Sequence, residues 1–88
     1  MQEEVRKKEL SKALGKVVER LRKQANLSSR TLAYEMGMSK TTFLLAEQGR
    51  LDPRISTFCK IAEAFYMKPD EFFSLVLKKL PEWWFPAE

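Results

Sequence analysis

The 88-residue sequence predicts an all-α fold built from five helices. Apolar residues recur at helical spacing in five stretches, glycines are few, and no stretch has the alternating β-branched pattern of a strand. A chain of this length has room for one modest core, which suffices for helices that pack together. We therefore expect residues 1–88 to form a single, compact all-helical domain.

The first helix is expected to end near Gln24, because apolar residues recur at helical spacing up to this region. Its apolar face consists of Leu10, Leu14, Val17, Val18, Leu21 and Ala25. Residues 1–9 carry few apolar side chains, so they either fray or extend the helix outward. Asn26 tolerates the left-handed conformation that commonly follows a helix.

Two short helices joined by a tight turn are expected at residues 29–36 and 40–48. Ser28 and Ser39 each offer a hydroxyl that accepts a hydrogen bond at the start of a helix. Gly37 takes the left-handed backbone conformation at little cost, which allows the chain to reverse sharply. Four apolar residues are spaced so that they face one shared core across the turn: Leu32, Met36, Phe43 and Ala46. Such a unit leaves its second helix protruding.

The last two helices are expected over residues 55–65 and from Pro69 to about Leu80. The apolar face of the earlier one consists of Ile55, Phe58, Ile61, Ala62 and Phe65. Pro69 suits the first turn of a helix, and the two acidic residues that follow it complement the positive end of the helix dipole. Pro81 is expected to end the fifth helix.

Positive charge is concentrated in the part of the chain that contains the two short helices. Residues 1–60 hold 13 of the 16 Lys and Arg residues but 7 of the 12 Asp and Glu residues. This imbalance favours a phosphate-rich partner such as nucleic acid. The alternative is a solvated basic face without a partner.

The sequence lacks the side chains that several chemistries need. Cys59 is the only cysteine and there is no histidine, which excludes an intramolecular disulfide, a Cys or His zinc site, and a Ser-His or Cys-His nucleophile. We therefore expect no enzymatic activity, no metal and no cofactor. No apolar run is long enough to span a membrane, and the charged N-terminus is unlike a signal peptide. We accordingly expect a cytoplasmic protein with no membrane partner.

Residues 29–48 and their surroundings resemble the helix-turn-helix of the phage-repressor type, the Cro and lambda-repressor (XRE) family. The resemblance runs from about residue 14 to about residue 75 and includes, in order, Leu21-Arg22-Lys23, Asn26-Leu27-Ser28, Glu47-Gln48-Gly49-Arg50, Pro53, Ile61-Ala62-Glu63-Ala64-Phe65 and Asp70-Glu71-Phe72-Phe73. Each motif is weak alone, but five helices in register make the combination specific. The resemblance implies a lambda-repressor-like DNA-binding domain whose second motif helix enters the major groove.

The resemblance also implies that residues 40, 41 and 45 read bases, while residues 42 and 44 lie nearer the DNA backbone or the groove edge. We therefore predict base contacts from Lys40, Thr41, Thr42, Leu44 and Leu45. A lysine suits guanine N7 or O6, and the threonine hydroxyls suit a base or a phosphate. The alternative for both threonines is capping of the helix N-terminus.

Leu44 and Leu45 depart from the family pattern, in which one or both positions are commonly polar. An apolar side chain makes no hydrogen bond, but Leu45 can pack on the methyl group of thymine. Two alternatives stay open at this point. This surface binds protein, or the helix is rotated so that a leucine is buried in place of Ala46.

Phosphate contacts are predicted from Ser29, Arg30, Arg50 and Arg54. Ser29 occupies a position where the family often has a glutamine that touches a phosphate, and the arginines lie near the start of the motif or in the loop after it. The alternative for each arginine is simple solvation.

A charge pair is implied between Arg22 and Glu47, because these residues match positions that join the first and third helices in members of the family. This role is structural, since the pair holds the DNA-reading helix in place. Losing one partner of a buried ion pair is costly, because the other charge stays desolvated.

Residues 81–88 form a C-terminal tail with three adjacent aromatic residues. Exposed apolar patches usually mark an interface, so we expect the tail to pack either on the domain's own core or, together with the fifth helix, across a second subunit. Because the family typically dimerises to read two half-sites, we expect a homodimer. The predicted dimer interface contains Phe72, Val76, Trp83, Trp84 and Phe85.

Together these inferences predict a transcription regulator that binds double-stranded DNA sequence-specifically, most simply a repressor that occupies an inverted-repeat operator as a homodimer. One alternative is an antitoxin of the same fold, whose protein partner is a toxin and which represses its own operon. Another is a protein-interaction adaptor that has lost DNA reading. Leu44 and Leu45 favour the adaptor, whereas the basic first part of the chain disfavours it.

Overall fold

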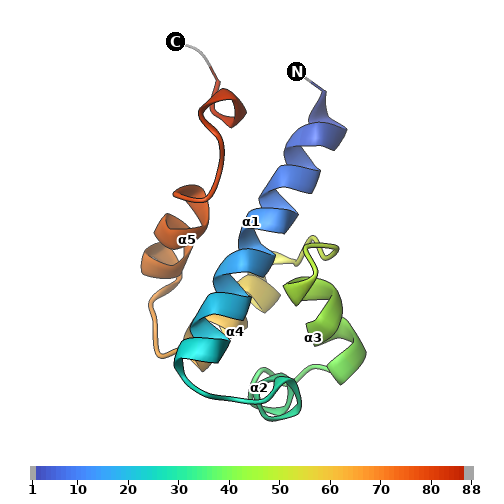
Figure 1. Cartoon of the computed structure of the whole chain (residues 1–88), viewed down its shortest axis with the longest axis vertical. Coiled ribbons are helices and arrows are strands. Elements are labelled where there is room, and N and C mark those ends of the chain that lie inside the picture. Colours follow the sequence, from blue (N-terminus) through green and yellow to red (C-terminus); the bar gives the residue numbers. More distant parts are fainter. Residues whose placement is uncertain (1, 87–88) are drawn as a thin grey trace.

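A computed structural model describes residues 2–86 as five α-helices and a short 3-10 helix (Figure 1). The elements are α1 (Glu3–Gln24), α2 (Ser29–Glu35), α3 (Lys40–Glu47), α4 (Ile55–Ala64), α5 (Pro69–Leu77) and η1 (Glu82–Trp84). No strand occurs in residues 2–86, so the predicted all-α class is confirmed. The predicted bounds of the first four helices agree with the structure to within one residue, apart from the start of the first helix, for which the sequence left two alternatives.

The long helix α1 runs through the middle of the molecule, with α3 on one side, α5 on the other and α4 behind it (Figure 1). Helix α2 packs against α3, and α4 packs against α5. The largest fully buried side chains come from all five helices: Val17, Val18, Leu32, Phe43, Ile61, Phe72 and Val76. The four residues predicted to face one core across the tight turn are each at most 3% exposed, which confirms that prediction.

The turn between α2 and α3 is closed as the sequence predicts. Ser28 Oγ accepts a hydrogen bond from the N–H of Thr31 at 3.1 Å, and Ser39 Oγ accepts one from the N–H of Thr42 at 3.1 Å. Gly37 has a φ of 66°, in the left-handed region that costs glycine little. These contacts fix the start of α3 relative to α2.

Helix α5 ends at Leu77, which is earlier than the predicted end near Leu80. The N–H of Leu80 donates to the carbonyl of Leu77 at 3.1 Å, a tighter i to i−3 bond than an α-helix has. The reason is the proline that follows, because Pro81 disfavours the α conformation of the residue before it. Leu80 is still buried, at 9% exposure.

Two residues of the predicted dimer interface are buried inside their own chain, and the assignment of Phe72, which lies fully in the core, is therefore wrong. Phe72 and Val76 are 0% and 1% exposed. The Phe72 ring lies 5.2 Å from the Phe58 ring and 6.2 Å from the Phe65 ring, measured between centroids. Helical periodicity identified an apolar face of α5 correctly, but this face packs on α1 and α4 and leaves no side-chain surface for a second subunit.

The aromatic tail folds back onto the first turns of α1. Trp84 Nε1 donates a 2.8 Å hydrogen bond to the carbonyl oxygen of Arg6, and Arg6 Nε donates a 3.2 Å bond to the carbonyl oxygen of Trp84. The Arg6 guanidinium carbon also lies 4.3 Å from the centroid of the Trp84 ring. Of the two alternatives for the tail, Trp84 thus packs on its own chain, whereas Trp83 and Phe85 stay 45% and 42% exposed.

The first residues of the chain extend α1 outward, which was one of the two alternatives for residues 1–9. The helix begins at Glu3 and continues without a break to Gln24. Both chain ends consequently lie at the same end of the molecule (Figure 1). Residue 1 lies outside the part of the chain that the structure describes.

Candidate nucleic-acid interface

Helix α3 buries one face and exposes the other. Phe43 and Ala46 are 0% and 2% exposed, whereas Leu44 is 36% exposed. The alternative in which a rotated helix buries a leucine in place of Ala46 is therefore wrong. Leu45 is half-buried at the edge of the exposed face, so neither leucine replaces a core residue.

The first turn of α3 presents the polar residues predicted to meet bases. Lys40 and Thr41 are exposed, and the Thr41 hydroxyl has no hydrogen-bond partner among the described residues. Thr42 is half-buried, and its hydroxyl accepts a 3.0 Å hydrogen bond from the hydroxyl of Ser39. Ser39 and not a threonine therefore caps α3, the Thr42 hydroxyl is engaged by that cap, and Thr41 is the threonine whose hydroxyl is available to a ligand.

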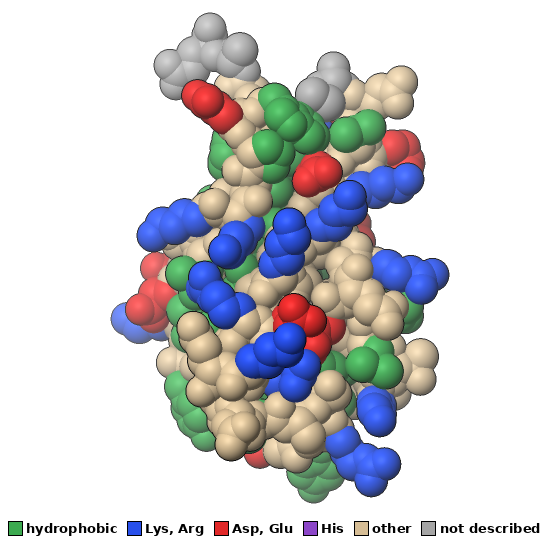
Figure 2. Space-filling model, in the orientation of Figure 1, with side chains coloured by type: hydrophobic (Ala, Val, Ile, Leu, Met, Phe, Trp, Pro, Cys, Tyr) green, Lys and Arg blue, Asp and Glu red, His purple; other side chains and the backbone are tan. Residues whose placement is uncertain are grey.

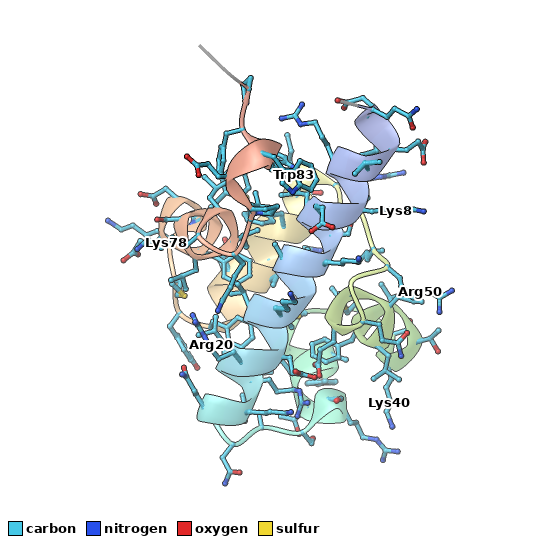
Figure 3. The ribbon with its side chains drawn as sticks, turned by 45° about the horizontal axis from the view of Figure 1, so that its top comes forward. Lys8, Arg20, Lys40, Arg50, Lys78 and Trp83 are labelled. Carbon is cyan, nitrogen blue, oxygen red and sulfur yellow. The ribbon has the colours of Figure 1, made fainter. Side chains whose placement is uncertain are left out.

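The predicted phosphate-binding residues lie before and after α3. Ser29 is half-buried and Arg30 is exposed, both at the start of α2. Arg50 is exposed in the loop after α3, and Arg54 is exposed directly before α4. Figure 3 shows that Arg50 projects from the same side of the molecule as Lys40. Cationic side chains thus accompany the exposed polar turn of α3 on this side.

An ion pair between Arg22 and Glu47 joins α1 to the end of α3. Arg22 Nε and Nη2 donate to the two carboxylate oxygens of Glu47 at 2.9 and 2.8 Å, and the two side chains are 17% and 9% exposed. Arg22 Nη1 also donates to the carbonyl oxygen of Leu27 at 3.1 Å. The hydrogen bond to Glu47 raises the pKa of Arg22 despite partial desolvation, which lowers it. A bidentate ion pair of this kind fixes the relative orientation of the two side chains as well as the distance between them.

Gly15 allows α1 and α3 to touch through their backbones. A Cβ atom at this position would lie 2.7 Å from the carbonyl oxygen of Glu47 and 2.8 Å from that of Ala46, closer than real Cβ contacts come. A glycine inside a helix lowers stability by about 0.5–1 kcal/mol relative to alanine, and the close contact of the two backbones explains why glycine is needed here. Our sequence analysis missed Gly15, although a glycine in a continuous helical pattern is the signal that points to a close approach.

Positive charge covers more of the surface than the helix-turn-helix alone. Figure 2 shows Lys and Arg side chains across the face of the molecule, from α5 over α1 to the outer edge by α3. Charge by itself therefore does not distinguish the predicted DNA-binding surface from the rest of the molecule. The predicted surface is distinguished by the exposed polar first turn of α3 together with the cations beside it.

Other kinds of site find no support in the part of the chain that the structure describes. Residues 2–86 contain no group of three or more His, Cys, Asp or Glu side chains placed to hold a metal ion. Cys59 is half-buried. None of the described helices combines the length and the apolar character that crossing a membrane requires.

Comparison with known proteins identifies the family. A family model described as a helix-turn-helix domain matches residues 13–72. The chain belongs to this family. Its members of the phage-repressor type are DNA-binding transcriptional regulators and not enzymes, and this chain is accordingly a DNA-binding regulator with a helix-turn-helix at α2 and α3.

Three relatives illustrate the similarity. An uncharacterized HTH-type transcriptional regulator of Methanocaldococcus jannaschii is 35% identical over 48 residues, which are 54% of this chain and 73% of the relative. The restriction-modification controller protein C.AhdI of Aeromonas hydrophila has a TM-score of 0.67 at 27% identity, covering 72% of this chain and 96% of its own. An HTH_3 family transcriptional regulator of Vibrio cholerae has a TM-score of 0.70 at 28% identity, covering 77% of this chain and 38% of its own.

Glu47→Gln should lower the free energy of unfolding by about 3 kcal/mol, because it leaves the half-buried guanidinium of Arg22 without its counter-charge. Urea denaturation followed by circular dichroism measures this loss. Glu9→Gln is the matched control, since the Glu9 carboxylate pairs with Lys12 at 3.8 Å near the other end of α1 and should contribute at most about 1 kcal/mol. Equal stabilities of the two variants would contradict the role given to the Arg22–Glu47 pair.

Proposed function

We propose that this protein is a repressor that binds an inverted-repeat DNA site as a homodimer and reads bases through α3. The observation that carries the proposal is the arrangement around α3. Its apolar face is anchored by Phe43 and Ala46, its polar first turn is exposed, and cations lie beside it. Repression by occupancy of promoter DNA requires DNA binding alone, which the family supplies.

The side chains on α3 suit a particular kind of base contact. An α-helix fits the major groove, where Lys40 can donate to guanine N7 or O6 and the Thr41 hydroxyl can bond a base edge. Leu44 and Leu45 offer apolar contact, for which the thymine methyl is the complementary group in that groove. We therefore expect a site in which guanine and thymine occupy adjacent contacted positions. Ser29, Arg30, Arg50 and Arg54 would contact phosphates and set the register of the helix.

The proposed dimer uses an apolar face that the family match alone does not specify. A cleft of about 310 Å³ opens between α1, α4 and α5, and its apolar walls include Leu10, Pro53, Phe58 and Phe73. Ile55 lies at the rim of this cleft and is 84% exposed. A protruding apolar side chain beside an apolar hollow is complementary to the same surface of a second copy related by a two-fold axis. This face therefore replaces Phe72 in the proposed interface, whereas Val76 lines the cleft although it is only 1% exposed.

The base-reading role of α3 is tested by selecting duplexes from a randomised pool with purified protein at about 150 mM salt, where unspecific phosphate contacts are weakened. We expect enrichment of a two-fold symmetric site. Lys40→Ala should then weaken binding to that site by about 1–3 kcal/mol and relax the preference at one base pair in each half-site. Lys78→Ala removes the same charge from the opposite side of the molecule and should preserve the preference (Figure 3).

The failure of this experiment would be informative. A folded protein that enriches no site would contradict the repressor proposal and favour the antitoxin, which needs its toxin for full DNA affinity. A Lys40→Ala variant that retains the base preference of the native protein would remove α3 from base reading.

The proposed dimer face is tested with Ile55→Glu, which places a charge in the apolar contact and should yield a monomer in sedimentation experiments. Affinity for the symmetric site should fall by more than affinity for a single half-site, because Ile55 lies outside the DNA-reading turn and the new carboxylate beside Arg54 adds only a weak, solvent-screened repulsion of the phosphates. Tyr34→Glu is the matched control, since Tyr34 is 85% exposed on α2 and does not line the cleft. If both variants sediment as the native protein does, the dimer does not use this face.

A further inference from the structure

Two segments of the chain lie outside the residues that match the family, one at each end. The match covers residues 13–72, so the first turns of α1 and the aromatic tail lie outside the matched domain. Both segments lie at the same end of the molecule (Figure 1). They are joined there by the reciprocal hydrogen bonds between Arg6 and Trp84 and by the guanidinium stacked on the indole ring.

This contact stabilises the beginning of α1. Isolated helical turns are marginal in water, and the first turns of a helix fray unless tertiary packing supports them. Trp84 supplies that packing, because its ring covers Arg6 while its indole N–H bonds the backbone of the same residue. The aromatic tail thereby gives the extension of α1 a defined position relative to the rest of the domain.

The extension of α1 forms one wall of a basic cleft. A cleft of about 450 Å³ lies between the first half of α1 and the loop that follows α3. Lys7, Lys8 and Lys12 line it from α1, and Arg50 lines it from the loop. Lys8 and Lys12 are exposed and lie about one helical turn apart, about 6 Å along the axis.

The negative charges at the cleft do not cancel the positive ones. Two carboxylates, Glu4 and Asp52, also line the cleft against its four cations. Lys12 additionally pairs with Glu9 at 3.8 Å, but the Lys12 side chain is 60% exposed and this weak pair exchanges readily with solvent and other anions. The cleft therefore remains an attractive surface for an anion.

The two walls of the cleft are held together by close backbone packing. A Cβ atom on Gly49 would lie 2.9 Å from Lys12 Cα, so the loop after α3 touches α1 directly at this point. Gly15, one turn further along α1, would bring a Cβ within 2.8 Å of the Gly49 nitrogen. The cations of α1 consequently keep a fixed place next to the C-terminal end of α3.

We infer that this basic cleft binds phosphates of the DNA strand that borders the major groove beyond the C-terminal end of α3. The inference rests on the proposed function. A helix that lies in the major groove is flanked by the two strands that border the groove, so cations on the elements next to α3 come within reach of their phosphates. Arg50 meets the strand at the C-terminal end, and Lys12 and Lys8 continue the line of cations along α1.

The labelled side chains agree with this path. Figure 3 shows Lys8, Arg50 and Lys40 projecting from one side of the molecule and Lys78 projecting from the opposite side. The two segments outside the family match thus enlarge the proposed DNA-contacting surface. The extension of α1 carries the cations, and the aromatic tail holds this extension in place. The ligand chemistry is that of duplex phosphates, and the contact adds affinity without reading bases.

The test compares two double variants that lose the same charge. Lys8→Ala with Lys12→Ala removes two cations from the cleft, and Lys78→Ala with Lys79→Ala removes two exposed cations near the end of α5. Dissociation constants for the selected site are measured from about 50 to 200 mM salt. The slope of log affinity against log salt should decrease in magnitude by about 0.9 for each lost phosphate contact, which is roughly 1.8 for each subunit and roughly 3.6 for the dimer on the symmetric site. The slope should stay unchanged for the control.

A substitution of opposite sign guards against loss of binding through misfolding. Glu4→Gln removes a carboxylate that lines the basic cleft but not the apolar cleft of the proposed dimer face, and it should tighten binding roughly 2- to 5-fold at low salt, a gain that damage to the fold does not produce. Equal slopes for the two double variants, or no gain from Glu4→Gln, would overturn the cleft as a DNA contact.

The outcomes separate this inference from the proposed function. If the native protein binds the symmetric site and Lys40→Ala loses base preference while the cleft variants match the native protein, the repressor stands and only the cleft is rejected. If the native protein binds no duplex, both proposals are wrong. Alanine favours helix more than lysine does, so helix propensity does not disfavour the cleft substitutions.

Discussion

The close contact between α1 and α3 is the constraint on which the rest of this structure depends. Gly15 lets the two backbones meet, and the Arg22–Glu47 pair locks the end of α3 from the side. The Ser39 cap fixes the other end of the helix. With both ends held, the buried side chain of Phe43 directs the polar first turn of α3 outward, so the surface that we propose meets DNA is positioned by packing.

Much of this arrangement was predictable because its signals are local. Gly37, Ser28 and Ser39 mark the turn and caps through their own backbone and hydroxyl chemistry, and the structure has them in those roles. Interactions between distant segments were harder. Apolar periodicity cannot tell a face that packs on the same chain from one that packs on a partner, which is why Phe72 was misplaced. The contact of Trp84 with Arg6 joins residues 78 positions apart, and no sequence pattern encodes that pairing.

The chain combines a helix-turn-helix domain with two segments outside the family match, one at each end, that pack against each other. Residues 13–72 supply the helix-turn-helix, whereas the beginning of α1 and the aromatic tail lie outside the family match and pack together. For Trp84, this contact answers whether the aromatic tail packs on its own chain or on a second subunit, since Trp84 packs on α1 of the same chain. The two segments thereby shape the basic surface beside α3, while α3 itself is held by its contacts with α1.

The most direct test of this account is to titrate a duplex that carries the selected site into isotopically labelled protein and follow the backbone amide resonances. The account predicts the largest shifts in residues 40–45 and at Arg50, where the exposed turn of α3 and the following loop meet DNA. Residues of α5 should shift little on a half-site duplex, because that helix lies on the other side of α1. Shifts confined to α5 and the aromatic tail, with residues 40–45 unchanged, would contradict it.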